Sequence, residues 1–147
     1  MKLAVIDYGM GNLHSVSKAL EASGANVVIV HHPQELESSS GIVLPGVGSF
    51  AQGIKHLQEL GFIEALNHEV IKQKKPFLGI CLGMQLAAES GDEHGPSQGL
   101  GWIKGNVVRL DAKQADVKVP HMGWNDVQMK NDSVLFRNIK GPLTFIL

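Results

Sequence analysis

The sequence has one cysteine, Cys81, and no excess of charge of either sign. A single cysteine cannot form an internal disulfide, so we expect a reducing compartment such as the cytoplasm. Lys and Arg number 13 against 14 for Asp and Glu. This balance gives no electrostatic reason to expect a nucleic acid or an anionic membrane as partner.

Long apolar runs are also absent. No stretch approaches the roughly 20 residues that a transmembrane helix needs. The first apolar run, residues 3–6, ends at Asp7, which makes it shorter than the core of a secretory signal. A length of 147 residues and a hydrophobic share of 44% predict one globular domain, spanning residues 1–147.

Apolar segments alternate with amphipathic ones in the first 90 residues. Continuous apolar segments at 3–6, 25–30, 41–44 and 76–80, of which the second is largely β-branched, are typical of strands buried on both faces. Between and after them, helical spacing predicts helices, the last over 82–89, with an end near Gly24 and a break near Gly61. The alternation predicts an α/β fold: an open, mostly parallel, flavodoxin-like sheet flanked by helices.

The pattern changes after residue 91. Residues 91–99 are expected to form a polar loop, and segments 102–110, 117–129 and 134–139 resemble short strands without helices between them. We expect an antiparallel extension of the same domain. The last residues, GPLTFIL, read as the start of a strand, which predicts a domain that is incomplete at its C-terminus.

Cys81 lies in the segment GICLG, between a predicted strand and a predicted helix. Gly79 and Gly83 flank it symmetrically, which is the thiol version of the G-x-S-x-G nucleophile elbow. The glycines permit a strained turn that side chains would crowd, and a helix N-terminus favours the thiolate. The alternative is a small buried hydrophobic residue. The surrounding pattern favours the nucleophile.

Such a nucleophile needs donors for an oxyanion and a base. The donors would be the Leu82 amide and an amide near Val47 or Gly48, because both loops follow strands of one parallel sheet. Candidate bases are seven histidines: His14, His31, His32, His56, His68, His94 and His121. The pair 31–32 is expected in a turn, and the helical histidines 56 and 68 are expected to be solvated. Their spacing matches no metal site.

The segment DYGMGNLHS fits a dinucleotide-binding fingerprint only in part. Gly9 and Gly11 match, but His14 occupies the third glycine position, and no acidic residue ends the second predicted strand. A P-loop is also missing. We therefore expect no nucleotide cofactor.

Four segments occur in the order DYGMGNL, LPGVGSF, PFLGICLGMQL and VPHMGWND. Together they resemble the class I glutamine amidotransferases, and within them the glutaminase subunits of imidazole glycerol phosphate synthase. The resemblance covers the whole chain. It implies that Cys81 attacks the side-chain amide of L-glutamine and that no cofactor or metal is needed. The implied substrate-binding residues are Gly46, Val47 and Gly48 of an oxyanion loop, Leu82 and Gln85.

The resemblance also implies a partner. Glutamine would be hydrolysed to glutamate and ammonia, and the ammonia would pass into a (β/α)8-barrel cyclase subunit within a heterodimer. There it would help form imidazole glycerol phosphate and aminoimidazole carboxamide ribotide, in histidine biosynthesis. The implied interface residues are Gly11, Asn12, His121, Met122, Trp124 and Asn125.

In one respect the sequence departs from this family. The family's catalytic histidine and glutamate lie in a C-terminal His-Pro-Glu-like motif, and no His-x-Glu occurs in these 147 residues. The resemblance therefore implies an N-terminal part of the domain with little or no glutaminase activity. Three alternatives stay open: a non-catalytic protein that binds the cyclase, an amidotransferase of another sugar pathway, or a different cysteine hydrolase with His121 or His94 as base.

Overall fold

The structure is a computed structural model, which describes residues 1–93, 95–110, 122–128 and 143–146. The chain divides into two units, Met1–Arg109 and Leu110–Leu147, and each is described by itself. Within the described residues, no helix combines the length and the apolar character needed to cross a lipid bilayer.

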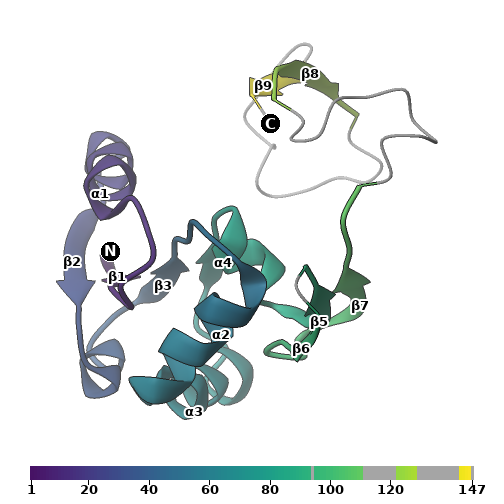
Figure 1. The fold of residues 1–147 in the computed structure, drawn as a ribbon. Coiled ribbons are helices and arrows are strands. Elements are labelled where there is room, and N and C mark those ends of the chain that lie inside the picture. Colours follow the sequence, from purple (N-terminus) through teal and green to yellow (C-terminus); the bar gives the residue numbers. More distant parts are fainter. Residues whose placement is uncertain (94, 111–121, 129–142, 147) are drawn as a thin grey trace. The chain divides into compact units, whose positions relative to one another are not determined.

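The first unit contains a parallel sheet with the strand order β2-β1-β3-β4 (Figure 1). Its strands are β1 (Lys2–Ile6), β2 (Asn26–Val30), β3 (Gly41–Leu44) and β4 (Phe77–Gly79). Ala4 is in register with both Val28 and Ile42, and Val43 with Leu78. All four residues of β3 are buried, as expected for a central strand. The predicted parallel sheet is therefore confirmed.

Helices connect these strands where the sequence predicted them. The connecting elements are α1 (Leu13–Ala22), a 3₁₀ turn (Pro33–Leu36), α2 (Phe50–Glu59), α3 (Phe62–Leu66) and a π-helical turn (Asn67–Lys72). Asn12 caps α1 by accepting a hydrogen bond from the Ser15 amide at 3.2 Å. Gly24 follows α1 at φ +83°, and Gly61 separates α2 from α3 at φ +73°. Both glycines adopt the left-handed conformation that ends or breaks a helix.

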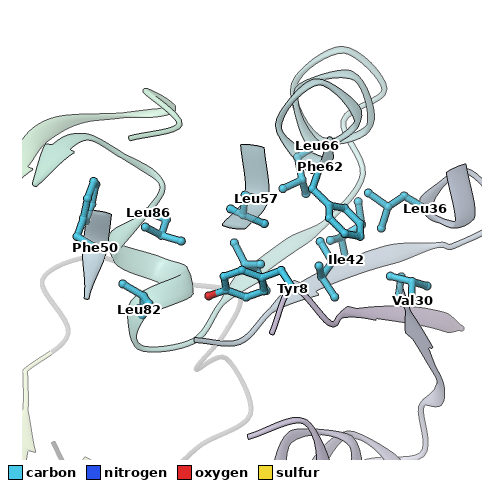
Figure 2. Packing of buried hydrophobic residues seen from close by; sticks show 13 residues of the cluster. Tyr8, Val30, Leu36, Ile42, Phe50, Leu57, Phe62, Leu66, Leu82 and Leu86 are labelled. Atoms are coloured by element: carbon cyan, nitrogen blue, oxygen red, sulfur yellow. The ribbon is translucent and has the colours of Figure 1, made fainter. Parts of the chain in front are cut away.

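One apolar cluster joins this sheet to its helices (Figure 2). Alternate sheet residues, Ala4, Ile6, Ile42 and Leu44, supply one side of it. The helices and turns supply fully buried side chains, which are Leu36, Leu57, Phe62, Leu66, Leu82 and Leu86. Because Leu82 and Leu86 belong to this cluster, the segment that follows Cys81 is anchored in the core of the unit.

The segment after Cys81 differs from the prediction of a helix over 82–89. Helix α4 covers only Leu82–Gln85, and β5 (Ala88–Asp92) follows it. The Ala87 carbonyl accepts hydrogen bonds from the amides of Trp102 and Ile103 at 2.9 and 3.0 Å, so it is not available to a continuing helix. A pattern within 82–89 cannot reveal these distant donors.

The extension after α4 is a mixed sheet with the order β6-β5-β7. Strand β6 (Pro96–Gln98) pairs antiparallel with β5, whereas β7 (Ile103–Val107) pairs parallel with it. The expectation of a loop over 91–99 was wrong, because its two ends form this hairpin. The expectation of an antiparallel extension was wrong for β7, which pairs parallel with β5, and right for the β5–β6 pair and for the β8–β9 pair of the second unit.

The second unit contains one antiparallel pair, β8 (Trp124–Val127) with β9 (Leu143–Ile146). Trp124 is in register with Ile146. These strands confirm the core of the predicted segments 117–129 and 141–147. The strand predicted at 134–139 lies outside the described residues.

Candidate active site

Cys81 occupies a sharp turn between β4 and α4. Its backbone has φ +54° and ψ −115°, a conformation that L residues rarely adopt and that stores about 1–3 kcal/mol. The Ile80 amide donates to the Leu44 carbonyl at 3.0 Å, and the Gln85 amide donates to the Cys81 carbonyl at 3.1 Å. These bonds join the turn to β3 and to α4. The thiol is free and exposed, so the predicted strand–turn–helix holds an accessible sulfur.

Glycine is required on both sides of this turn. A Cβ atom on Gly79 would lie 2.6 Å from the Gly83 carbonyl oxygen and from the Met84 amide nitrogen. A Cβ atom on Gly83 would lie 1.8 Å from the Leu44 carbonyl oxygen. Atoms of the main chain cannot move aside as the end of a side chain can. The symmetric glycines therefore let two backbone segments approach each other across the elbow.

The loop after β3 packs directly against the elbow. A Cβ atom on Gly46 would lie 2.8 Å from Leu82 Cβ and 2.9 Å from the Gly83 amide nitrogen. Gly48 has φ +109°, and a Cβ there would lie 2.7 Å from Met10 Cε. The loops that follow β1, β3 and β4 thus meet at the carboxyl end of the parallel sheet, which is where open α/β sheets bind ligands.

The other residues predicted to bind substrate lie around the same turn. Leu82 is the first residue of α4, and the first amides of a helix have no acceptor within it. Gln85 follows within that helix and is half-buried, and Val47 in the facing loop is 56% exposed. The structure brings Gly46 and Leu82 together, and it leaves the Val47 side chain open to solvent.

Tyr8 also lies in this region, although the sequence did not predict it as a site residue. It follows β1, it is only 1% exposed, and its hydroxyl has no hydrogen-bond partner among the described residues. A Cβ on Gly46 would lie 2.5 Å from Tyr8 Oη. Burial and, secondly, the negative charge of Cys81 raise the pKa of Tyr8, so it stays protonated. Only the tertiary contact with the 45–48 loop identifies it.

No described histidine is hydrogen-bonded to Cys81. His56 Nδ1 lies 3.0 Å from the Tyr8 carbonyl oxygen. A carbonyl only accepts, so Nδ1 carries the proton. His56 is therefore half-buried and bonded, and the expectation that it is solvated was wrong. His68 is exposed as expected. His94 and His121 lie outside the described residues.

The predicted interface residues belong to both units. In the first unit, Asn12 already caps α1, and a Cβ on Gly11 would lie 3.2 Å from Pro45 Cγ. In the second unit, Met122 and Trp124 are 81% and 72% exposed. The side-chain amide of Asn125 donates to the Gly123 carbonyl at 3.1 Å. Large exposed apolar side chains such as these two are frequent at protein interfaces.

Residues 4–146 match the family model described as glutamine amidotransferase class-I. The chain is 48% identical over 143 residues to imidazole glycerol phosphate synthase subunit HisH 1 of Campylobacter jejuni subsp. jejuni, covering 97% of this chain and 71% of the relative. It is 51% identical over 151 residues to subunit HisH of Bacillus licheniformis, covering 99% and 69%.

A solved structure described as a glutamine amidotransferase superposes with a TM-score of 0.66. The two share 18% sequence identity, and the superposition covers 84% of this chain and 62% of that one. At this identity the likeness concerns the fold. It agrees with the helix-flanked parallel sheet described above.

Proposed function

The chain belongs to the class-I glutamine amidotransferase family, and from this membership we propose that it is the glutaminase subunit of an imidazole glycerol phosphate synthase. The observation that carries the proposal is Cys81 at φ +54°, with Gly46 of the facing loop packed against Leu82 beside it. That arrangement combines an exposed thiol with the amide of Leu82, which has no acceptor within α4 because it begins that helix.

In the proposed reaction, the Cys81 thiolate adds to the side-chain amide carbon of glutamine. The carbonyl oxygen becomes an oxyanion, which would accept hydrogen bonds from the Leu82 amide and from an amide of the loop 46–48. The carbon–nitrogen bond then breaks, the nitrogen takes a proton, and ammonia leaves a thioester. Water hydrolyses the thioester to glutamate and returns the thiol. Gln85, on the first turn of α4, would help to hold the substrate.

Both the departure of ammonia and the attack of water need a proton carrier. Three histidines of the described residues contact other groups: His56 contacts Tyr8, His31 lies 3.3 Å from Asp7, and His68 lies 3.0 Å from Glu69. We propose that the residues of the polypeptide 1–147 do not include the catalytic base. Loss of general acid–base catalysis lowers the rate by about 10²- to 10⁴-fold.

The proposed partner is a (β/α)8-barrel cyclase subunit that would receive the ammonia in a cytoplasmic heterodimer. Its products would be imidazole glycerol phosphate and aminoimidazole carboxamide ribotide. The contact would include Gly11, Asn12, His121, Met122, Trp124 and Asn125. Support comes from the exposure of Met122 and Trp124. A second reading, in which the 147 residues bind the cyclase without catalysing hydrolysis, rests on the finding that no described histidine is hydrogen-bonded to Cys81.

Two measurements test the proposal. Glutamine should slow alkylation of Cys81 by iodoacetamide, because the substrate would cover the thiol. No protection at saturating glutamine would refute the glutamine site. Glutamate release with saturating cyclase and its ligand should stay below about 1% of the rate of a relative such as the Bacillus licheniformis subunit. A comparable rate would place the base within these residues.

Binding to the cyclase is tested separately. Trp124→Ala should weaken binding of the chain to the cyclase subunit of a related synthase by tenfold or more, since buried tryptophans dominate interface energies. Ile103→Ala is the matched control, because Ile103 is also exposed, at 59%, and lies outside the proposed contact. Equal affinities for the two variants would contradict the proposed interface.

A further inference from the structure

Tyr8 carries a buried hydroxyl that nothing in the described part of the chain satisfies. The side chain is 1% exposed, and no partner lies within hydrogen-bond reach of Oη. Folded proteins pair nearly all their buried polar groups, because an unpaired one is destabilising. A phenylalanine would fill the same space without this penalty. The hydroxyl therefore needs a reason other than packing.

Its position supplies the reason. Tyr8 Oη lies where the loop 45–48 meets the elbow, since a Cβ on Gly46 would be 2.5 Å from Oη and 2.8 Å from Leu82 Cβ. Figure 2 shows the hydroxyl pointing toward Leu82, the residue next to Cys81. Burial chiefly raises the pKa of Tyr8, and an ionised Cys81 raises it further, so the thiolate lies within electrostatic range of the hydroxyl. The hydroxyl and the thiol therefore share one electrostatic environment.

We propose that the Tyr8 hydroxyl donates a hydrogen bond to the Cys81 thiolate and is a further catalytic residue of the glutaminase site. The inference rests on the proposed role of Cys81 as nucleophile. Since Cys81 Sγ is not within hydrogen-bond reach of Oη in the structure, the exposed Cys81 side chain must turn about its Cα–Cβ bond to accept, while the proton stays on the tyrosine. A donor to the charged form of a thiol lowers its pKa and raises the thiolate fraction at neutral pH. The donor finds its acceptor when the thiol ionises.

Other ionisable groups on the surrounding elements already have partners. His56 on α2 bonds to the Tyr8 carbonyl, and Asp7 accepts from the Gly9 amide at 3.0 Å and pairs with His31. Glu93 accepts from the Phe50 amide at 3.0 Å, at the start of α2. Tyr8 therefore carries the unpaired buried side-chain donor in the described part of this region.

The first test uses the only cysteine of the chain. The rate of alkylation by iodoacetamide, followed by intact mass against pH, gives the midpoint of thiol ionisation. Tyr8→Phe should raise this midpoint by about one pH unit, which slows alkylation about tenfold below the midpoint. Ser17→Ala is the matched control, because Ser17 Oγ is also buried without a described partner but lies on α1. It should leave the midpoint unchanged.

The thermal midpoint of Tyr8→Phe separates this role from a packing role. The variant should melt at or above the temperature of the parent chain, because it loses an unpaired buried hydroxyl. An unchanged alkylation midpoint overturns the proposal, whatever the thermal midpoint. Absence of glutamine protection together with a raised midpoint would overturn the proposed function and leave the Tyr8–Cys81 bond standing.

A second test needs no variant. Tyr8 is the only tyrosine, so labelling tyrosine with ¹³C at Cζ gives one signal from the intact chain. The signal should move with pH at the midpoint found by alkylation, because the hydroxyl gains an acceptor when the thiol ionises. It should stay constant once Cys81 has been alkylated. A parent signal that does not respond at that midpoint overturns the proposal.

Discussion

Replacing Gly83 by alanine tests the contact between the elbow and the central sheet. The added Cβ would lie 1.8 Å from the Leu44 carbonyl oxygen and 2.7 Å from its carbonyl carbon. An ordinary contact needs about 3.4 Å, and Leu44 is fixed as a fully buried residue of β3. Helix α4 would therefore have to move away from β3, which would also loosen Leu82 and Leu86 in the core.

Two effects of opposite sign act in this variant. Alanine is favoured over glycine within a helix by about 1 kcal/mol. Overpacking of a rigid core costs typically 1–3 kcal/mol, and more where the backbone must shift. A clash of this size against a carbonyl group favours the upper end, and after the helix-propensity gain we expect a net loss of about 2 kcal/mol. For a unit of this size, that lowers the melting temperature by roughly 10 °C.

Gly53→Ala is the matched control for Gly83→Ala. Gly53 is likewise a buried helical glycine, but the three atoms nearest to its added Cβ would be side-chain methyl groups of Leu86 and Leu82, at 3.0 to 3.3 Å. Those methyl groups can turn aside, so the variant should stay within about 1 kcal/mol of the parent chain. Thermal unfolding followed by circular dichroism measures both variants. Equal melting temperatures for Gly83→Ala and the parent would refute the described packing of α4 on β3.

Three further changes have definite expected outcomes. Cys81→Gly should increase the free energy of unfolding by about 1–2 kcal/mol and so raise the melting temperature, because glycine relieves the backbone strain at φ +54°. A lower melting temperature would argue against strain at this residue. Glu93→Ala should lower stability by about 1 kcal/mol, since the Phe50 amide at the start of α2 loses its acceptor, and denaturant titration would detect this. A hydrogen bond from Lys75 is the main reason why the pKa of buried Glu69 lies below its usual value near 4.5. The ionised pair therefore stabilises the fold above the unfolded pKa, and this stabilisation is lost as the pH falls through the lower pKa of the folded state. Lys75→Met should therefore cost about 3 kcal/mol at pH 7 and weaken the acid dependence of stability, and an unchanged dependence in equilibrium unfolding between pH 3 and 7 would count against the pair.

The sequence was a good guide to the sheet and to its turns. Continuous apolar strands and the glycines after α1 and α2 follow from local rules, because burial on both faces and left-handed backbone leave a mark on the residues themselves. The α4 segment was predicted too long for the opposite reason. The carbonyl of Ala87, just after α4, accepts from the amides of Trp102 and Ile103, and no local pattern encodes that competition.

His56 likewise shows a contact that the local sequence does not predict. His56 was expected to be solvated, because its helical neighbours are polar. Its ring nitrogen instead lies 3.0 Å from the carbonyl of Tyr8, which is 48 residues away along the chain. A contact of that separation depends on how α2 packs against the loop after β1, and the spacing of residues within α2 carries no information about it.

By itself, the sequence determined that Cys81 stands on an elbow. The glycines at 79 and 83 are a local requirement, since any side chain there would meet main-chain atoms within 2.6 Å. Only the tertiary structure decided what surrounds the sulfur. Gly46 packs against both Leu82 and Tyr8. These contacts form because the loops after β1, β3 and β4 meet where three neighbouring parallel strands end.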